Sequence, residues 1–216
     1  LGVLASGGHT HLYWIRSAVD FEELGQTLDD AAGEAFDKIG QAINLPYPAG
    51  ARIDELAKDG TATFDLPRPF TDNDNLDFSF SGLKTAAIKL AREKLETKRD
   101  IHNFCASLNE AIADTLTIKT ERAARTRKPA AIWLAGGVAA NSRIRQKLGE
   151  LAASLGIPFL APEKKHCQDN AAMIAYNGWE IARRGLAHKL DLEAIPRGAR
   201  MPDDSRGVIC LDSERP

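Results

Sequence analysis

Hydrophobic positions along this 216-residue chain follow the period of strands in some stretches and the period of helices in others. The central stretch, residues 131–148, begins as an apolar run of strand type. It breaks at two glycines and a polar residue suited to capping, and then resumes with apolar residues at helical spacing. This pattern predicts a strand, a tight turn and a helix, as in an α/β domain.

The predicted turn contains Gly136 and Gly137. Glycine adopts backbone conformations closed to other residues and lets a ligand approach closely. The start of the following helix offers free N–H groups and the positive end of the helix dipole, so an anion or a nucleotide is the natural ligand. A plain strand-to-helix connection fits the same spacing, and both interpretations stay open here.

A second glycine loop lies near the start of the chain. Residues 3–5 and 10–15 read as two short strands joined across a Ser-Gly-Gly turn. The tip of such a hairpin can present backbone N–H groups and the hydroxyls of Ser6 and Thr10 to a phosphate. Because the first residues already read as the middle of a strand, we expect the chain to lack its natural beginning.

Two histidines, His9 and His11, follow this loop. Residues two apart on a strand need a third ligand from elsewhere to hold a metal ion, and the neighbouring sequence offers none. Packing or hydrogen-bonding roles are therefore favoured for both side chains.

Residues 29–43 show the apolar stripe of a helix, which Asp29 or Asp30 can cap. Asp37 lies off the centre of that stripe. It is either a solvated surface acid or an acceptor that reaches a ribose hydroxyl from the edge of a cleft. Prolines and a glycine in residues 45–50 then force an irregular loop.

The remaining chain alternates extended pieces with helices. Lys84 falls in the first turn of one helix, where its charge opposes the helix dipole, so it serves a bound anion, an acidic partner or solvent. Asp169 is placed as a helix cap, because it lies too close to His166 and Cys167 for a compact metal site. Residues 172–181 then carry the packed faces of the last helix. Further predicted elements are a helix over 52–58, a strand over 78–81 running into a helix from 82, a helix over 100–125 and a strand over 157–161.

Composition limits the class of protein. Hydrophobic residues make up 44% and charged residues 27% of the chain, as in ordinary globular proteins. Three cysteines without a close pair, Cys105, Cys167 and Cys210, argue against a disulfide framework and a cysteine-rich zinc site, which fits a reducing cytoplasm. The sequence has no signal-peptide pattern and no apolar run of membrane-spanning length, so we expect no membrane partner.

The net charge of −2 gives no overall attraction for nucleic acid. Local basic clusters are nevertheless candidates for RNA contacts, although a solvated helix face is the favoured explanation of each cluster taken alone. The clusters are Arg122, Arg125, Arg127 and Lys128; Arg143, Arg145 and Lys147; and Arg183, Arg184 and Lys189.

Five stretches together carry a resemblance to a known family. They are Ser-Gly-Gly-His-Thr at 6–10, Asp-Asp-Ala-Ala-Gly-Glu-Ala-Phe-Asp-Lys at 29–38, Phe-Ser-Phe-Ser-Gly-Leu-Lys-Thr at 78–85, Ala-Gly-Gly-Val-Ala-Ala-Asn at 135–141 and Asp-Asn-Ala-Ala-Met-Ile-Ala at 169–175. In this order they resemble the tRNA N6-adenosine threonylcarbamoyltransferase family, whose members were once called glycoproteases.

The resemblance implies an actin-like (ASKHA, RNase H-like) nucleotide-binding α/β fold, here mainly the C-terminal lobe of a two-lobe protein. Residues 1–189 form this domain in that interpretation, and residues 190–216 form an extended or disordered tail. The implied reaction moves a threonylcarbamoyl group from threonylcarbamoyl-AMP to the N6 amine of the adenosine adjacent to the anticodon in tRNA. The implied partners are this adenylate or an ATP-type nucleotide, tRNA, and proteins of the threonylcarbamoyladenosine pathway.

The resemblance also assigns roles to residues. The family's contacts to the substrate adenylate fall on Leu4, Ala5, Ser6, Gly7, Gly8, Asp37, Gly50 and Asn141. The loop at 4–8 is expected to hold phosphate, Asp37 the ribose, and Gly50 and Asn141 the nucleoside side of the cleft. The family's metal-binding aspartate falls on Asp169, as a ligand of one iron or other divalent metal ion.

The chain departs from the family pattern in three places. It has Ala49 where the family commonly has glycine, and Gln168 where the family commonly has threonine. The family's other two metal ligands come from a His-x-x-x-His motif upstream of the first glycine loop, and the five histidines here have no such spacing. We therefore expect this chain alone to bind metal poorly and to be inactive or nearly so.

Two alternative functions stay open. The first is a non-catalytic nucleotide-binding scaffold of the same fold, which the missing histidines suit. The second is a metallopeptidase, which would need the same missing motif. The sequence offers no Ser-His-Asp or Cys-His nucleophile set, and this weakens the peptidase alternative.

Overall fold

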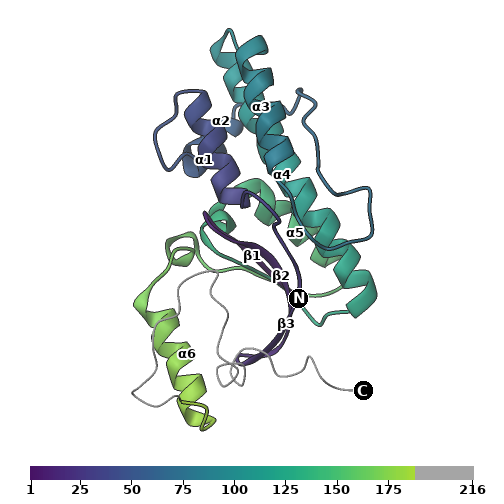
Figure 1. The fold of residues 1–216 in the computed structure, drawn as a ribbon, viewed down its shortest axis with the longest axis vertical. Coiled ribbons are helices and arrows are strands. Elements are labelled where there is room, and N and C mark those ends of the chain that lie inside the picture. Colours follow the sequence, from purple (N-terminus) through teal and green to yellow (C-terminus); the bar gives the residue numbers. More distant parts are fainter. Residues whose placement is uncertain (188–216) are drawn as a thin grey trace. The chain divides into compact units, whose positions relative to one another are not determined.

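The computed structural model describes residues 1–187 and confirms an α/β fold (Figure 1). Its contacts separate into two compact units. The first unit consists of Leu1–Tyr13 and Glu23–Gln168. The second unit consists of Trp14–Glu22 together with the segment that begins at Asp169.

A five-stranded sheet runs in the order β3-β2-β1-β4-β5. β1 is antiparallel to β2 and parallel to β4, and β4 is parallel to β5. The predicted hairpin at the start of the chain and the predicted central strand are therefore confirmed. The strands are β1 (Gly2–Ala5), β2 (Thr10–Ser17), β3 (Asp20–Gln26), β4 (Ile132–Ala135) and β5 (Phe159–Leu160).

The central strands bury one of their two faces. Successive residues of a strand point to opposite sides of the sheet, and Val3, Ala5, Ile132 and Leu134 are all at most 1% exposed. These side chains join the apolar stripes of the helices in one core. Trp133 lies between two of them in sequence and is 56% exposed, as the alternation requires.

The longest helix of the first unit is α4 (Lys98–Arg127). α4 begins with a capping box, in which the Thr97 hydroxyl accepts the N–H of Asp100 while the Asp100 carboxylate accepts the N–H of Thr97. Both α2 and α5 pack along α4. The other helices are α1 (Ala32–Ala42), α2 (Gly50–Ala57), α3 (Ser81–Lys94) and α5 (Ser142–Ser154), the single-turn 3-10 helices η1 (Gly137–Ala140) and η2 (Lys164–His166), and α6 (Ala171–Arg183), which belongs to the second unit.

The prediction that Asp29 or Asp30 caps α1 is wrong. The hydroxyl of Thr10, on β2, accepts the N–H of Ala32 at 2.9 Å and takes that place. Asp29 instead caps α3, because its Oδ1 accepts the backbone N–H groups of Phe80 and Ser81. The cap and the helix that it stabilises are therefore about 50 residues apart in sequence.

The predicted strand over 78–81 is also wrong. Only Phe78 makes an isolated parallel bridge, with Thr27. The residues after Phe78 are held by the Asp29 carboxylate instead of by a neighbouring strand. Its Oδ2 accepts the hydroxyls of Ser79 and Ser81 at 2.6 Å each. This extra cap draws the start of α3 to Ser81, one residue before the predicted start.

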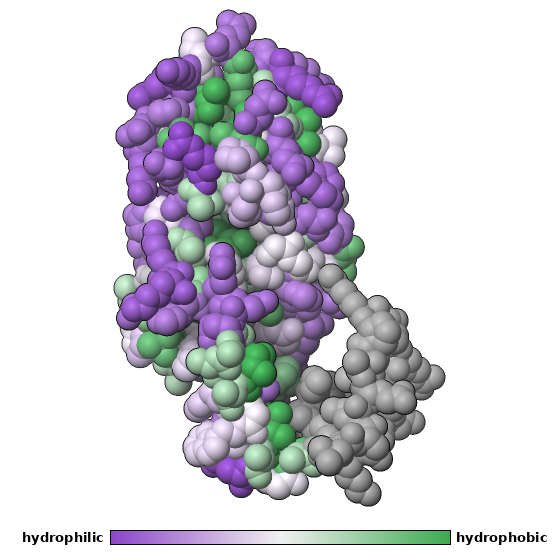
Figure 2. Space-filling view, turned by 90° about the vertical axis from the view of Figure 1, so that its left-hand side faces the viewer, coloured by the Kyte–Doolittle hydropathy of each residue, from purple (hydrophilic) through white to green (hydrophobic). Residues whose placement is uncertain are grey.

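Two predictions for the second unit fail as well. Asn170, and not Asp169, caps α6, because its Oδ1 accepts the N–H of Met173 at 3.1 Å. Residues 172–181 were expected to be packed, but Ile174 is 68% exposed and Trp179 is 57% exposed. Figure 2 shows apolar residues on the surface at the lower end of the view, where α6 lies.

α5 ends shortly before Gly156, which has a φ of 68° in the left-handed region that favours glycine. Within the described part of the chain, no helix combines the length and the apolar character needed to cross a membrane. The predicted tail at 190–216 lies outside the described residues.

Candidate functional site

The two glycine loops meet at one edge of the sheet. β1 and β4 are parallel neighbours with Leu4 opposite Ala135, so the loops that follow them leave the sheet on the same side. Ligands of open α/β sheets bind at this carboxyl edge. Gly136 has a φ of 93°, and a Cβ atom there would lie 2.2 Å from the carbonyl oxygen of Ala5. Only glycine allows this close approach of the turn to β1.

The first loop is held by its own serine. The backbone N–H of Ser6 donates to the carbonyl of His9 at 2.8 Å, and the Ser6 hydroxyl accepts the N–H of His9 at 3.1 Å. The Thr10 hydroxyl is fully buried at the start of α1, so the prediction that it faces a phosphate is wrong. Beside Gly7 and Gly137, by contrast, a Cβ atom would meet nothing within 4 Å. Both loops therefore border open space.

The start of α1 packs directly on the first loop. The N–H of Gly33 donates to the carbonyl of Ser6 at 3.0 Å. A Cβ atom on Gly33 would lie 2.6 Å from that oxygen and 2.8 Å from the Cα of Gly7, so no larger residue fits without a shift of the backbone. This contact fixes the position of the loop relative to α1.

Asp37 lies one helical turn after Gly33 and is half-buried. Its Oδ1 accepts the backbone N–H of Ala49 at 2.7 Å and thereby ties the proline-rich loop to α1. Gly50 is the first residue of α2 and follows this anchored residue directly. The structure thus brings Asp37 and Gly50 close together.

Asn141 caps α5 from the glycine turn. Its Oδ1 accepts the N–H groups of Arg143 and Ile144 at 3.0 and 3.1 Å, and its Nδ2 donates to Oδ1 of Asn109 at 3.0 Å. The residue is only 7% exposed. Both ends of this amide are therefore engaged within the protein.

Asp54 and Asn109 belong to the same cluster, and no sequence motif pointed to either residue. Asp54 is 7% exposed, and its Oδ1 accepts the backbone N–H and the hydroxyl of Ser142 at 3.1 and 2.7 Å. Asn109 is 2% exposed and bridges Asp54 and Asn141. A signal was available for Asn109, because it stands next to Leu108 on the apolar stripe of a long helix, where a polar side chain needs a buried partner.

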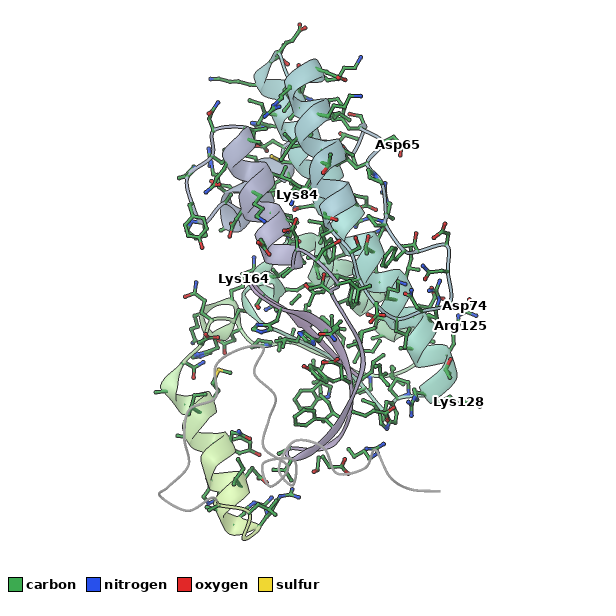
Figure 3. All side chains as sticks on the ribbon, in the orientation of Figure 1. Asp65, Asp74, Lys84, Arg125, Lys128 and Lys164 are labelled. Carbon is green, nitrogen blue, oxygen red and sulfur yellow. The ribbon has the colours of Figure 1, made fainter. Side chains whose placement is uncertain are left out.

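Lys84 lies on α3 (Figure 3). It has an acidic partner within the chain, which was one of its three predicted alternatives. It pairs with Asp30, and Lys38 pairs with the same carboxylate at 2.7 Å. Burial opposes the charged form of Asp30, but its two lysines hold the pKa of the carboxyl below its usual value. Together with the cap from Asp29, this ion pair joins two of the five sequence motifs to each other.

The histidines after the first loop take packing and hydrogen-bonding roles, as predicted. His11 Nδ1 lies 2.9 Å from a carboxylate oxygen of Glu23 on β3. The His11 ring stacks on Tyr13 at 5.5 Å between ring centres, with an interplanar angle of 4°.

Cys105 is fully buried in the core, where burial raises the pKa of its thiol to about 12 and makes it unreactive.

Asp169 is exposed and lies in the second unit, whereas the other predicted site residues lie in the first. Of the nearby candidates for metal ligation, Cys167 is buried, and its sulfur accepts a hydrogen bond from Arg145 at 3.3 Å. Across residues 1–187 no group of three His, Cys, Asp or Glu side chains is arranged to hold a metal ion. These residues do not make up a complete metal site.

Most cations of the basic clusters are already engaged. Arg143 pairs with Glu110, and Lys147 pairs with Glu110 and Asp114. The others make the following contacts: Arg122 donates to the carbonyls of Thr71 and Asn75, Arg125 pairs with Glu121, Arg145 donates to the carbonyls of Ala139 and Pro162, and Arg183 and Arg184 pair with Glu180. Arg125 and Lys128 lie at the C-terminal end of α4 (Figure 3), and Lys189 lies outside the described residues.

Solved structures support the fold alone. The chain is similar to HypF from T. kodakarensis, with a TM-score of 0.57 and 17% identity over 78% of this chain and 21% of that one. It is also similar to the activator of the 2-hydroxyisocaproyl-CoA dehydratase from Clostridium difficile with bound ADPNP, with a TM-score of 0.50 and 13% identity over 87% of this chain and 63% of that one.

Curated relatives give a closer match. The tRNA N6-adenosine threonylcarbamoyltransferase of Nitratidesulfovibrio vulgaris is 48% identical over 95% of this chain and 63% of its own length. The protein of the same name from Maridesulfovibrio salexigens is 46% identical over 94% of this chain and 63% of its own length. The chain thus spans a little under two thirds of these relatives. The family model described as tRNA N6-adenosine threonylcarbamoyltransferase matches residues 1–176, and the chain, with its actin-like α/β fold, belongs to that family.

Proposed function

We propose that this chain carries the nucleotide-binding part of an enzyme that transfers a threonylcarbamoyl group. The donor is threonylcarbamoyl-AMP, and the acceptor is the N6 amine of the adenosine adjacent to the anticodon in tRNA. One observation carries the proposal: the loop at Gly7 and the turn at Gly137 meet at the carboxyl edge of parallel strands and border open space. Family membership supports the reaction class.

The loops supply what an adenylate needs. The backbone N–H groups of Gly7 in the first loop and of Gly137 in the turn bind the phosphate. Asp37 holds the ribose through its second carboxylate oxygen, since its first oxygen is occupied by the N–H of Ala49. Gly50 and Asn141 border the nucleoside. The Ala49 contact keeps the Asp37 carboxylate in one orientation before the ligand arrives, which lowers the cost of binding.

The transfer itself needs an electrophilic carbonyl and a stable leaving group. The N6 nitrogen of adenosine attacks the carbamoyl carbon, the bond from that carbon to the phosphate oxygen breaks, and the nitrogen gives up one proton to water. AMP leaves with the electron pair of the broken bond. N–H groups that hold the phosphate stabilise the negative charge that grows on it during this step. Holding both reactants in line lowers the barrier further.

The family resemblance implies iron or another divalent metal ion, with Asp169 as one ligand. A single exposed carboxylate is too weak to hold iron, and the described residues form no group of three suitable ligands. We therefore assign no step to a metal. We predict that the purified chain, loaded with ferrous iron and desalted, retains less than one tenth of an iron per chain by atomic absorption. One iron per chain would contradict this prediction.

Binding of tRNA is part of the proposal. Ion pairs and hydrogen bonds within the chain engage most members of the basic clusters, so we assign the tRNA contacts largely to partner proteins of the threonylcarbamoyladenosine pathway. A cytoplasmic location fits such partners. A non-catalytic nucleotide-binding scaffold is the second candidate, favoured by the incomplete set of metal ligands in residues 1–187.

Calorimetric titration with AMP tests the nucleotide site. Asp37→Asn is the sharper variant, because its amide oxygen can still accept the N–H of Ala49 while its NH2 group replaces the oxygen that would bind ribose. We expect the variant to lose at least tenfold in affinity, or about 1.4 kcal/mol. The control is Asp65→Ala, which removes an exposed acid outside the site. Equal affinity of the parent and the Asp37→Asn variant would contradict the role of Asp37.

A further inference from the structure

We propose that Asn109 is a positioning residue for the nucleotide site, because it sets the orientation of the Asn141 amide at the glycine turn. The inference rests on the proposed function, in which the turn binds the adenylate. Asn109 lies on α4, away from the glycine loops in sequence, and acts only through Asn141. The sequence motifs of the family resemblance do not include it.

Burial makes the hydrogen bonds of Asn109 obligatory. The residue is 2% exposed, and Leu108 and Ile112 on the same helix are fully buried. A polar group buried without a partner costs about 1–3 kcal/mol. Asn109 avoids that cost in two directions, since its Nδ2 donates to Asp54 at 3.2 Å and its Oδ1 accepts from Asn141 at 3.0 Å.

The order of donors and acceptors has one satisfactory solution. An ionised carboxylate only accepts hydrogen bonds, so Asn109 must turn its NH2 group toward Asp54. Its oxygen then faces Asn141, which must present its own NH2 group in turn. This leaves the Asn141 oxygen for the N–H groups at the start of α5. A flipped Asn109 would place oxygen against carboxylate and NH2 against NH2.

The three side chains connect three elements. Asp54 lies on α2, Asn109 on α4 and Asn141 between η1 and α5. Asp54 also accepts the N–H and the hydroxyl of Ser142, so it holds the start of α5 twice, once directly and once through Asn109. The Asp54 carboxylate thereby fixes the orientation of the Asn109 and Asn141 side-chain amides. It also fixes the position of α2, which begins at Gly50, relative to the glycine turn.

Exchange of the two functional groups tests this arrangement. Asn109→Asp keeps the shape and the acceptor for Asn141 but replaces the donor to Asp54 by a second carboxylate oxygen. The double variant Asp54→Asn, Asn109→Asp restores one donor and one acceptor between the two positions, in reversed order. It also removes the acceptor of the Ser142 N–H, because Asp54 accepts Asn109 and Ser142 with the same oxygen, so the rescue is partial. The control is Asn44→Asp, which makes the same chemical change on an exposed residue.

The first readout is amide hydrogen exchange of Arg143 and Ile144, whose N–H groups donate to Asn141. We expect exchange at least tenfold faster in Asn109→Asp, at least threefold slower in the double variant than in that single variant, and no change in Asn44→Asp. If the single variant does not fold by circular dichroism, a folded double variant still supports the proposal. Parental exchange in Asn109→Asp, or a double variant no better protected than the single one, would overturn it.

The second readout is AMP affinity, expected to fall at least tenfold in Asn109→Asp. If the parent binds AMP and Asn109→Asp binds it with the same affinity, the positioning role is overturned. A parent that does not bind AMP would instead contradict the proposed function. Because the exchange measurement needs no nucleotide, it would still decide whether Asn109 orients Asn141.

Discussion

At the scale of single residues, the site depends on glycines that bring backbone segments into contact. Gly136 lies against the carbonyl of Ala5, and Gly33 lies against Ser6 and Gly7. In both places a Cβ atom would come closer than 3.0 Å to backbone atoms, which cannot rotate away as a side chain can. These two residues fix the glycine loops between β1, β4 and α1.

Gly33→Ala tests this view within a helix. Alanine is normally preferred to glycine in a helix by about 1 kcal/mol, but here its methyl group would meet the Ser6 carbonyl at 2.6 Å. We expect a loss of about 1–3 kcal/mol in the free energy of unfolding, as for other overpacked sites. Denaturant unfolding measures it. Gly149→Ala is the matched control, since its Cβ would make an ordinary 3.6 Å contact with Phe159 and should not destabilise the protein.

At the scale of elements, charged side chains join α4 to α5 and to the loop before α3. Glu110 and Asp114 on α4 share Lys147, Glu110 also holds Arg143, and Asp114 also holds Arg68. Hydrogen bonds from Arg143, ahead of those from Lys147, lower the pKa of Glu110 to about 2. These groups are buried enough for their pairing to contribute to stability, unlike isolated surface pairs.

The pH dependence of stability reports on this network. Because the pKa of Glu110 is depressed in the folded protein, its contribution is fully present above its unfolded pKa of about 4.5 and is lost as the pH falls toward 2. We expect Glu110→Gln to lower the free energy of unfolding by about 2 kcal/mol at pH 7. The difference from the parent should shrink between pH 5 and pH 3.

Urea unfolding across this pH range measures the difference. Glu121→Gln is the matched control, because Glu121 forms a more exposed pair with Arg125 on the same helix and should change stability by less than about 0.5 kcal/mol. If the difference in free energy of unfolding between the parent and Glu110→Gln stayed constant down to pH 3, the stabilising role of the ionised Glu110 carboxylate would be contradicted.

At the scale of the whole molecule, the sequence predicted what is local and missed what joins distant segments. The strand, glycine turn and helix around Gly136 follow from spacing alone, and the structure confirms them. Asp29 shows the other case. Its position suited a cap for the next helix, but it caps α3 because the fold brings residues 29 and 80 together. No local pattern contains that information.

The residues of the candidate site likewise fall into those that sequence motifs indicate and those that only the fold brings together. Motifs located the glycine loops, Asp37, Gly50 and Asn141, whereas the Asp54 to Asn109 contact joins residues 55 positions apart and appears only in three dimensions. The buried Lys119 is a further example. Its ammonium group donates to the carbonyl and side chain of Asn75 in the loop before α3, and no pattern along the chain indicates a buried lysine at this position.

The central claim is that the two glycine loops form one nucleotide site. The most direct test is a two-dimensional amide NMR titration of the parent chain with AMP. We expect the largest shifts at the N–H groups of Gly7 and Gly137, with saturation at a single dissociation constant for both. Shifts centred instead on the open pocket that Thr85, Ile88 and Arg92 line on α3, or no shifts at millimolar AMP, would contradict the claim.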